Sequence, residues 1–347
     1  MCGLYTARAV CNRLQNFVTF VEGDAAGDRH PSGWVGHVRA KGLEGAVRLA
    51  TVVTNGGLRL HVRARSGYVD VGIATKREDL ASVSGLLRAG PRALDDVRAL
   101  ESQDGRELTQ GEFGPAVPDP GRVLCLGVNY SEHAIEGGRA VPTWPECFMR
   151  GAESLTGPFS DLVRPALSDH FDYEGELGIV IGEGGRYITA DRALDAIAGY
   201  VVLNDGSLRD WQRAGTQWTA GKNFDGSMPI GPEVVTADEV DVSDLALTTT
   251  LNGDVMQSAR TSQMIVDVPA TIEFFSAFTA LRPGDVIATG TPGGVGFARK
   301  PPVWMQPGDV VEVTIEKIGT ISNRVVAEEG GPTSWRWRPE AKERSSI

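Results

Sequence analysis

Residues 172–182 read DYEGELGIVIG, and this stretch decides how the middle of the chain folds. Its β-branched run at 179–181 is closed by a glycine, which predicts a β-strand. Alternate residues of a strand project to the same face, so we expect Glu174 and Glu176 to lie side by side. Two carboxylates held that closely repel each other unless a proton or a cation neutralises them. The stretch therefore predicts a buried acidic pair, although a Glu-x-Glu on a solvated strand edge has the same spacing.

A third acid stands at the end of a second strand-like run, YVVLND at 200–205. Its last residue, Asp205, can add another oxygen to the pair. Three carboxylates with no cluster of Cys or His beside them favour a hard cation, Mg²⁺ before Mn²⁺ or Ca²⁺. The sequence thus predicts a divalent-metal site made by Glu174, Glu176 and Asp205.

The bulk composition limits the kind of protein this is. With 347 residues, 41% of them hydrophobic and 23% charged, the chain is a globular protein long enough for two domains. Its net charge of −11 argues against nucleic acid or an anionic membrane as the main partner. No apolar run approaches the ~18 residues that a membrane span needs, and residues 1–5 lack the design of a signal peptide. The four cysteines have no CxxC spacing, so we expect reduced thiols and a cytoplasmic location.

The order of strand and helix patterns indicates a mixed α/β, β-rich chain. In the first third, strand-like runs at 17–21 and 58–62 lead to helical spacing over 78–101. In the remainder, strands and Gly/Pro turns dominate, with helices expected near 190–198 and 268–279.

A polar, proline-containing stretch at 111–120 is typical of a linker, and after it the sequence is dominated by strand patterns and Gly/Pro turns. It predicts three parts in the chain. These are a small N-terminal α+β domain at 1–118, a catalytic domain at 119–329 and a C-terminal tail at 330–347.

A histidine and a glutamate three residues apart are candidates for proton transfer. A strand ends near Gly127 and a short helix is expected from Ser131, which puts His133 and Glu136 on one face of a helical turn. A carboxylate beside an imidazole orients the ring and raises its basicity, as a general base requires. A pair on the helix surface without a function has the same spacing.

Three further features can contact an anionic substrate. Lys222 lies among glycines and aromatic residues, where it can hold an anion or belong to a solvated loop. Gln212 can donate its amide to a substrate oxygen or cap its own helix. The glycine-rich loop at 290–296, which begins with Gly290 and Thr291, can offer backbone N–H groups to an anion. It matches neither a Walker loop nor a Rossmann fingerprint, so nucleotide binding is not expected.

Five motifs follow one another along the chain: GVNY at 127–130 with His133, DYEGEL at 172–177, ND at 204–205 with RDWQ at 209–212, GKNFD at 221–225, and PGDVIATGTPGGVG at 283–296. In this order and with these gaps they resemble the fumarylacetoacetate hydrolase family. Within that family they are similar to the bacterial branch of acylpyruvases and 2-hydroxyhepta-2,4-diene-1,7-dioate isomerases. The resemblance covers about residues 120–326, and the residues before about 115 are matched only loosely.

The resemblance implies a β-roll catalytic domain, usually in a homodimer, with a Mg²⁺ or Mn²⁺ site. It implies that Glu174, Glu176 and Asp205 bind the metal, and that His133 with Glu136 forms a base dyad on a lid. Lys222 is implied in catalysis. The residues implied in substrate contact are Tyr130, Arg150, Gln212, Gly290 and Thr291.

The chain departs from the family pattern at two positions. Arg150 stands where relatives often have lysine, which keeps the cation but changes its geometry. Gly206 replaces the usual apolar residue after the metal aspartate, which affects the fine shape of the expected site.

The implied activity is that of a divalent-metal-dependent hydrolase cleaving a C–C bond in a 2,4-dioxo acid of the acylpyruvate type. The cleavage would use a metal-stabilised enolate and a water activated by the His–Glu dyad. A decarboxylase, or an isomerase or tautomerase, of a 2-oxo or 2-hydroxydienoate intermediate in aromatic degradation needs the same enolate, and the fold does not choose between them. A non-catalytic binding protein is the alternative of another class, against which the complete acidic triad argues. For an enzyme, the expected partner is a small oxo acid.

Overall fold

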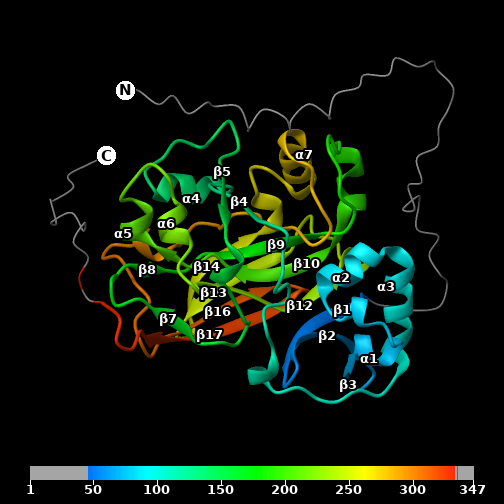
Figure 1. Ribbon diagram of the computed structural model, residues 1–347. Helices are drawn as coiled ribbons and strands as arrows, with labels where there is room; N and C mark the ends of the chain where they lie inside the picture. The colour runs from blue at the N-terminus through cyan, green and yellow to red at the C-terminus, as the bar shows by residue number, and fades with distance from the viewer. Residues whose placement is uncertain (1–45, 333, 335–347) are drawn as a thin grey trace, which may run out of the picture. The chain divides into compact units, whose positions relative to one another are not determined.

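The computed structural model describes residues 46–332 and residue 334 (Figure 1). The strand expected at 17–21 lies outside the described residues, as does most of the predicted tail after residue 330. Strands and short helices alternate through the described part, so the mixed α/β, β-rich class predicted from the sequence is confirmed. No helix within these residues is long and apolar enough to cross a membrane.

A ten-stranded sheet forms the main layer of the fold. Its middle strands β9 (Gly175–Ile181) and β10 (Ile197–Asn204) are antiparallel, and every residue in both is buried. Strands buried on both faces read as nearly continuous apolar runs, which is why these two are recognisable in the sequence. From one edge to the other the strands are β3 (Gly67–Asp70), β2 (Gly57–Ala64), β1 (Arg48–Thr54), β12 (Met228–Thr236), β10, β9, β15 (Val286–Ala288), β4 (Val123–Leu126) and β5 (Cys147–Arg150), with β6 (Leu155–Thr156) paired to β12.

A second, five-stranded sheet covers one face of the first. Leu247 and Val313 of this sheet share a core cluster with Leu177 and Ile179 of β9. The strands drawn in orange and red in Figure 1 belong to it. In order they are β14 (Asp254–Arg260), β13 (Ala246–Leu251), β16 (Val310–Ile315), β17 (Gly319–Ala327) and β7 (Leu162–Arg164), while β8 (Phe171–Asp172) and β11 (Ser207–Leu208) form a separate ladder.

Helices pack on both faces of the main sheet. Leu86 of α2 and Val97 of α3 join the core cluster of one face, and Ile272 of α7 joins that of the other. The α-helices are α1 (Val71–Thr75), α2 (Val83–Ala89), α3 (Pro91–Arg98), α4 (Ser131–Glu136), α5 (Arg209–Gln212), α6 (Thr219–Lys222) and α7 (Val268–Phe278). The 3₁₀ helices are η1 (Glu78–Leu80), η2 (Ala99–Ser102), η3 (Gln110–Glu112), η4 (Ala152–Ser154), η5 (Ala190–Ala196), η6 (Ala237–Glu239), η7 (Thr261–Gln263) and η8 (Gly296–Ala298).

The helical segment predicted over 78–101 is broken into several short helices. Ser82 caps α2 by accepting from the Gly85 N–H, and Gly90 ends that helix at a φ of 85°. Pro91 then opens α3, where its missing N–H costs nothing. The helix predicted near 268–279 is confirmed as α7. The helix predicted near 190–198 is the 3₁₀ helix η5, which ends where β10 begins.

The strands before residue 118 extend the main sheet. β1 pairs antiparallel with β12, so that Arg48 lies opposite Val235. The side chain of Arg48 also donates to Glu233 on β12, a carboxylate that is 1% exposed. The division of the chain at residue 118 remains a prediction, and the N-terminal strands are joined to the strands beyond it by both backbone and side-chain bonds.

Candidate active site

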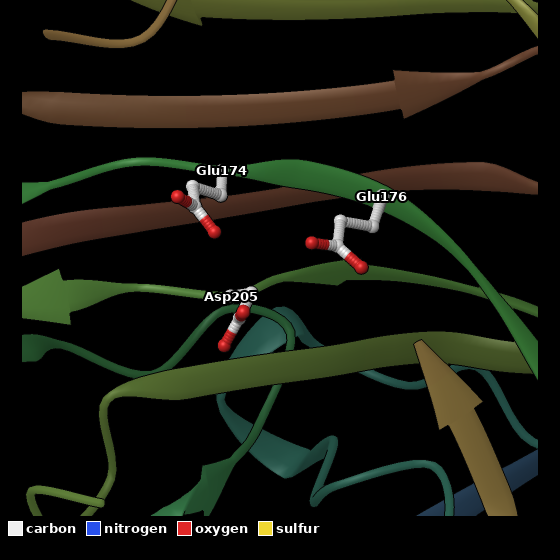
Figure 2. A group of neighbouring side chains, drawn as sticks. All are labelled: Glu174, Glu176 and Asp205. Carbon is white, nitrogen blue, oxygen red and sulfur yellow. The ribbon is translucent and has the colours of Figure 1, made fainter. Parts of the chain in front are cut away.

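The register of β9 and β10 brings the three predicted acids together. Gly175 pairs with Asn204 and Glu176 with Leu203, so Glu174, just before β9, meets Asp205, just after β10. The Asp205 N–H donates to the Glu174 carbonyl at 2.8 Å. One ligand oxygen from each of Glu174, Glu176 and Asp205 lies within 4.8 Å of the other two. Figure 2 shows the three carboxylates turned toward one shared space.

The acidic triad is buried, and cationic side chains contact two of its members, Glu174 and Asp205. Lys222 Nζ lies 2.6 Å from Glu174 Oε2 and 2.5 Å from Asp205 Oδ2, and Arg209 Nη2 lies 2.6 Å from Glu174 Oε1. Burial raises the pKa of Glu174, but the charges of Arg209 and Lys222 outweigh it and hold that pKa well below the ordinary value. Burial, followed by the charges of Asp205 and Glu174, raises the pKa of Glu176 well above the ordinary value.

This donor set fits a hard divalent cation. All three ligands are oxygens, and all three side chains are buried, at 4%, 1% and 1% exposure for Glu174, Glu176 and Asp205. Carboxylate oxygens are the ligands that Mg²⁺, Mn²⁺ and Ca²⁺ prefer. A cation there would also relieve the repulsion that raises the pKa of Glu176.

The His133–Glu136 pair forms on α4 as the spacing predicts. Nδ1 of His133 is 2.8 Å from Glu136 Oε1. Because a carboxylate only accepts, Nδ1 carries the proton and the Nε2 of a neutral ring is the basic atom. Glu136 Oε2 accepts from the Gly294 N–H at 2.7 Å, so the glycine-rich loop fixes the orientation of the pair.

One cavity of about 550 Å³ joins the triad to this pair. The predicted residues that line it are His133, Glu174, Glu176, Asp205, Gln212, Lys222 and Thr291. Aromatic walls come from Phe148, Trp218 and Phe297, and Phe148 packs edge-on against Trp218 with ring centroids 5.5 Å apart. The cavity therefore combines a metal-binding corner, a basic imidazole and apolar surface.

Three residues predicted to contact substrate lie elsewhere. The Arg150 side chain is 0% exposed and donates to Asp205, Ser154 and Ser227, behind the triad and outside the cavity wall. Tyr130 is 2% exposed in the hydrophobic core, where burial raises the pKa of its hydroxyl. The N–H of Gly290 donates to Glu176 Oε2 at 2.7 Å, so this glycine orients a triad member. Their assignment to substrate contact remains a prediction, with geometry that favours supporting roles for Arg150 and Gly290.

The remaining loop residue, Thr291, lines the cavity but is anchored to the strands beneath it. Its hydroxyl donates to the Gly175 carbonyl at 3.0 Å and accepts from Gln257 Nε2 at 2.7 Å. Gln212 also lines the cavity, and its Oε1 accepts from Arg209 Nη1 at 2.9 Å.

Sequence reasoning missed a buried ion pair that supports the site. Asp172 is 0% exposed and accepts from Arg209 Nε at 2.8 Å, from the Gly296 N–H at 2.8 Å and from the Phe297 N–H at 3.0 Å. Arg209 in turn contacts Glu174. The position of Asp172, two residues before Glu174 in the DYEGEL stretch, was the available signal. Gln257 carried no signal, because a single Gln in a polar strand is ordinary.

The glycine-rich loop and its continuation to Phe297 hold three carboxylates through backbone N–H groups. The Glu176 carboxylate accepts a hydrogen bond from the Gly290 N–H, and the Glu136 carboxylate accepts one from the Gly294 N–H. The Asp172 carboxylate accepts from the N–H groups of both Gly296 and Phe297. A Cβ on Gly294 would lie 2.1 Å from the Met256 carbonyl oxygen, and the φ of Gly294 is 103°. These N–H groups are bound to carboxylates of the protein itself, and contact of the loop with a substrate anion stays a prediction.

Comparison with known proteins gives one matching family, described as Fumarylacetoacetate (FAA) hydrolase C-terminal, over residues 122–326. A mitochondrial oxaloacetate tautomerase from Bos taurus is 45% identical over 245 residues, which are 69% of this chain and 78% of the relative. A 2,4-didehydro-3-deoxy-L-rhamnonate hydrolase from a Sphingomonas strain is 44% identical over 239 residues, 66% of this chain and 84% of the relative.

Two solved structures show the same similarity. A fumarylacetoacetate hydrolase from psychrophilic Exiguobacterium antarcticum has a TM-score of 0.68 and 34% identity, and the match covers 81% of this chain and 100% of that one. A fumarylpyruvate hydrolase from Pseudomonas aeruginosa, in complex with Mn²⁺ and pyruvate, has a TM-score of 0.56 and 32% identity, with 62% and 92% of the two chains covered.

Proposed function

The chain belongs to the fumarylacetoacetate hydrolase family, and from this we propose that it is a divalent-metal-dependent hydrolase that cleaves a C–C bond in a 2,4-dioxo acid of the acylpyruvate type. The observation that carries the proposal is the shared cavity. It brings a buried acidic triad and a carboxylate-oriented imidazole to the walls of one space. Hydrolysis of this kind needs both a polarised carbonyl and an activated water.

The triad residues Glu174, Glu176 and Asp205 are proposed to hold the cation. A bound Mg²⁺ or Mn²⁺ would polarise a carbonyl oxygen of the substrate and offset the negative charge that develops there. Lys222 contacts two of the three ligands, so it is suited to fix their orientation and to face a substrate oxygen beside them. The Mn²⁺ and pyruvate bound by the fumarylpyruvate hydrolase support a divalent ion and an oxo acid as ligands.

His133 is proposed to be the general base. Its Nε2 takes a proton from water, and the water oxygen attacks the C4 carbonyl of the dioxo acid. The C3–C4 bond then breaks, which gives a carboxylic acid and the enolate of pyruvate. C3 takes up a proton, and His133 returns to the neutral form. Glu136 stabilises the imidazolium in between, since its carboxylate is 2.8 Å from Nδ1.

Tautomerisation of a 2-oxo acid is the second candidate function. The 45% identity to an oxaloacetate tautomerase supports it. That reaction needs only removal of a proton from C3 and protonation of the enolate oxygen, or the same two steps in reverse, so His133 would act without an attacking water. Decarboxylation or isomerisation of a related oxo acid would use the same triad.

Product identity separates these reactions. Acetylpyruvate is incubated with protein loaded with Mg²⁺ or Mn²⁺, and pyruvate is followed through NADH oxidation by lactate dehydrogenase. Oxaloacetate enol-to-keto conversion is followed in parallel by ultraviolet absorbance, and an EDTA-treated sample is the control. Metal-dependent pyruvate release supports the hydrolase, whereas enol conversion without pyruvate release supports the tautomerase. Neither activity, together with no binding of a divalent ion, would leave a binding protein.

Two companion properties are proposed on the family relationship. We expect a homodimer, which light scattering coupled to gel filtration tests. We also expect Mg²⁺ or Mn²⁺ to activate better than Ca²⁺, because a smaller hard cation polarises an oxygen more strongly; turnover with each ion tests this.

A further inference from the structure

Strand β14, at the edge of the five-stranded sheet, buries a polar residue and exposes an apolar one. Gln257 is the one buried residue of this strand, at 1% exposure, while Val255 is 61% exposed. A buried amide costs free energy unless its donors and its acceptor are hydrogen-bonded. The hydrogen-bond partners of Gln257 therefore indicate why an amide occupies this position.

The Gln257 side chain binds β9 and the glycine-rich loop at the same time. Its Oε1 accepts from the Gly175 N–H at 3.0 Å. Its Nε2 donates to Thr291 Oγ1 at 2.7 Å and to the Pro292 carbonyl at 2.9 Å. Because a backbone N–H only donates, the Gly175 contact determines which end of the amide is the oxygen. The oxygen and both N–H groups of this amide therefore have partners.

These contacts close a ring around the residue that separates two triad members. Gly175 lies between Glu174 and Glu176, and its carbonyl accepts from the Thr291 hydroxyl at 3.0 Å. Since Gln257 donates to that hydroxyl, the hydroxyl proton is directed to Gly175. Three hydrogen bonds thus join Gly175, Gln257 and Thr291. A change at Gln257 therefore reaches both the triad and a residue of the cavity wall.

A β-bulge lies next to Gln257. In the ladder between β13 and β14, Gln257 pairs with Thr249. The next pair joins Val255 to Thr250, so Met256 is an extra residue on β14. Bulges redirect side chains and are common beside active sites. We attribute the inward direction of the Gln257 amide to this bulge.

We propose that Gln257 is a positioning residue of the active site. It holds the segment from Glu174 to Glu176 against the glycine-rich loop, and so determines how tightly the two glutamates bind the cation and how Thr291 meets the substrate. Gln257 lies outside the cavity wall and acts through Gly175 and Thr291. The inference rests on the proposed function, because it takes the triad as the metal site and Thr291 as a substrate contact.

Gln257→Met tests both parts of this role, because methionine has a similar length and no amide. We expect Kd for Mn²⁺, measured by titration calorimetry, to rise about tenfold or more, as for other groups that support metal ligands. At saturating Mn²⁺, KM for acetylpyruvate should rise about fivefold or more, as the loss of a hydrogen bond predicts, while kcat changes by less than about threefold. A variant that is only destabilised would have a lower Tm without either change.

A double-mutant cycle shows whether the effect on the substrate passes through Thr291. Thr291→Val removes the hydroxyl that accepts from Gln257. Adding Gln257→Met to this variant should raise KM by no more than about twofold, because residues that act as a unit have non-additive effects. The loss of Mn²⁺ affinity should persist in this background, since it passes through Gly175. Additive effects on KM overturn the inference.

Asn323→Leu is the matched control. Asn323 is a buried amide on β17 of the same sheet, and it donates to the carbonyls of Gly157 at 3.2 Å and Ser160 at 2.8 Å, away from the cavity wall. This variant should have a lower Tm with unchanged Kd for Mn²⁺ and unchanged KM. Gln257→Asn, whose amide is one methylene shorter, should raise Kd and KM in the same direction as Gln257→Met and replaces it if that variant does not fold.

Metal binding separates this inference from the proposed function. If the wild-type protein binds Mn²⁺ but releases no pyruvate, the hydrolase is removed, and the Kd of the Mn²⁺-loaded proteins for pyruvate replaces KM. Weaker binding of both Mn²⁺ and pyruvate by Gln257→Met then supports the inference without the hydrolase. An unchanged Kd for Mn²⁺ in folded Gln257→Met overturns the inference, and metal-dependent pyruvate release by the same variant leaves the hydrolase in place.

Discussion

Replacement of Glu176 by glutamine tests the metal site most directly. The substitution keeps the size of the side chain and an oxygen that can accept from the Gly290 N–H, 2.7 Å away in the native protein. It removes one of three negative charges whose ligand atoms lie within 4.8 Å of each other. We therefore expect the variant to bind the metal more weakly. We expect no loss of stability in the metal-free protein, because the substitution reduces the mutual repulsion of the carboxylates there.

The magnitude follows from the role of the residue. Loss of a group that merely supports a metal ligand costs ~10- to 100-fold in affinity, so loss of a charged ligand should cost at least about 100-fold. At a metal concentration of 100 times the wild-type Kd, binding stabilises the native protein by about 2.7 kcal/mol, against about 0.4 kcal/mol when Kd equals that concentration. For a chain of this size these values correspond to rises in Tm of roughly 4 °C and roughly 0.5 °C.

Differential scanning calorimetry with EDTA and with Mn²⁺ measures both quantities, and titration calorimetry gives Kd. Glu183→Gln is the matched control, because Glu183 follows the same strand but lies outside the triad. It should keep the wild-type response to Mn²⁺. A Glu176→Gln protein with the full Mn²⁺-dependent rise in Tm would refute the assignment of Glu176 as a ligand, and a large fall of Tm in EDTA would refute the argument from repulsion.

Three other substitutions have distinct expected results. His133→Ala should keep the Mn²⁺-dependent rise in Tm and lose about 10²- to 10⁴-fold in kcat for pyruvate release, the usual share of a general base; unchanged turnover would remove His133 from the mechanism. Glu136→Gln should lower kcat with KM nearly unchanged, because the amide cannot stabilise the imidazolium 2.8 Å away, and a change confined to KM would contradict the dyad. Asp172→Asn leaves Arg209 without one of its two buried carboxylate partners and should destabilise the protein by about 3–5 kcal/mol, measured by denaturant unfolding in EDTA, where a loss below about 1 kcal/mol would contradict the importance of this pair.

The sequence predicted the site best where the residues lie within one strand or one helical turn, because the period of that element determines which side chains share a face. Glu174 lies just before the buried strand β9 and Glu176 lies in it, two residues apart, and the alternation of an extended chain predicts that their side chains share one face. Asp205 joins them because β9 and β10 pair in a register that their apolar runs help to fix. The contact of His133 with Glu136 was predictable from the spacing of one helical turn. The short-range patterns therefore predicted the pairing of Glu174 with Glu176 and of His133 with Glu136, whereas the place of Asp205 depends on the pairing of β9 with β10.

Contacts between segments that are distant in the sequence could not be predicted from local residue patterns. Arg209 and Asp172 are 37 residues apart, and their pairing depends on β8 and β11 forming a ladder. The direction of Arg150 depends on the packing of β5 beside Asp205, which no local period encodes. The helix predicted near 190–198 ends at Ala196 as η5, and β10 begins at Ile197. Ile197, Tyr200 and Val201 are better placed in a buried strand than on a helix surface.

The segment from Gly290 to Phe297 has a consequence for how this protein can change. Its contacts with Glu176, Glu136 and Asp172 are made by peptide nitrogens, so at Phe297 the contact does not depend on the side chain that the donor carries. The donors Gly290, Gly294 and Gly296 must stay glycine, because an added Cβ on each would meet neighbouring atoms at 2.7 Å or less. Spacing along the chain is what matters, since one inserted or deleted residue would shift the later donors relative to their acceptors. Libraries that alter the size of the substrate pocket should therefore vary residue type at Phe297 and keep the number of residues in this segment constant.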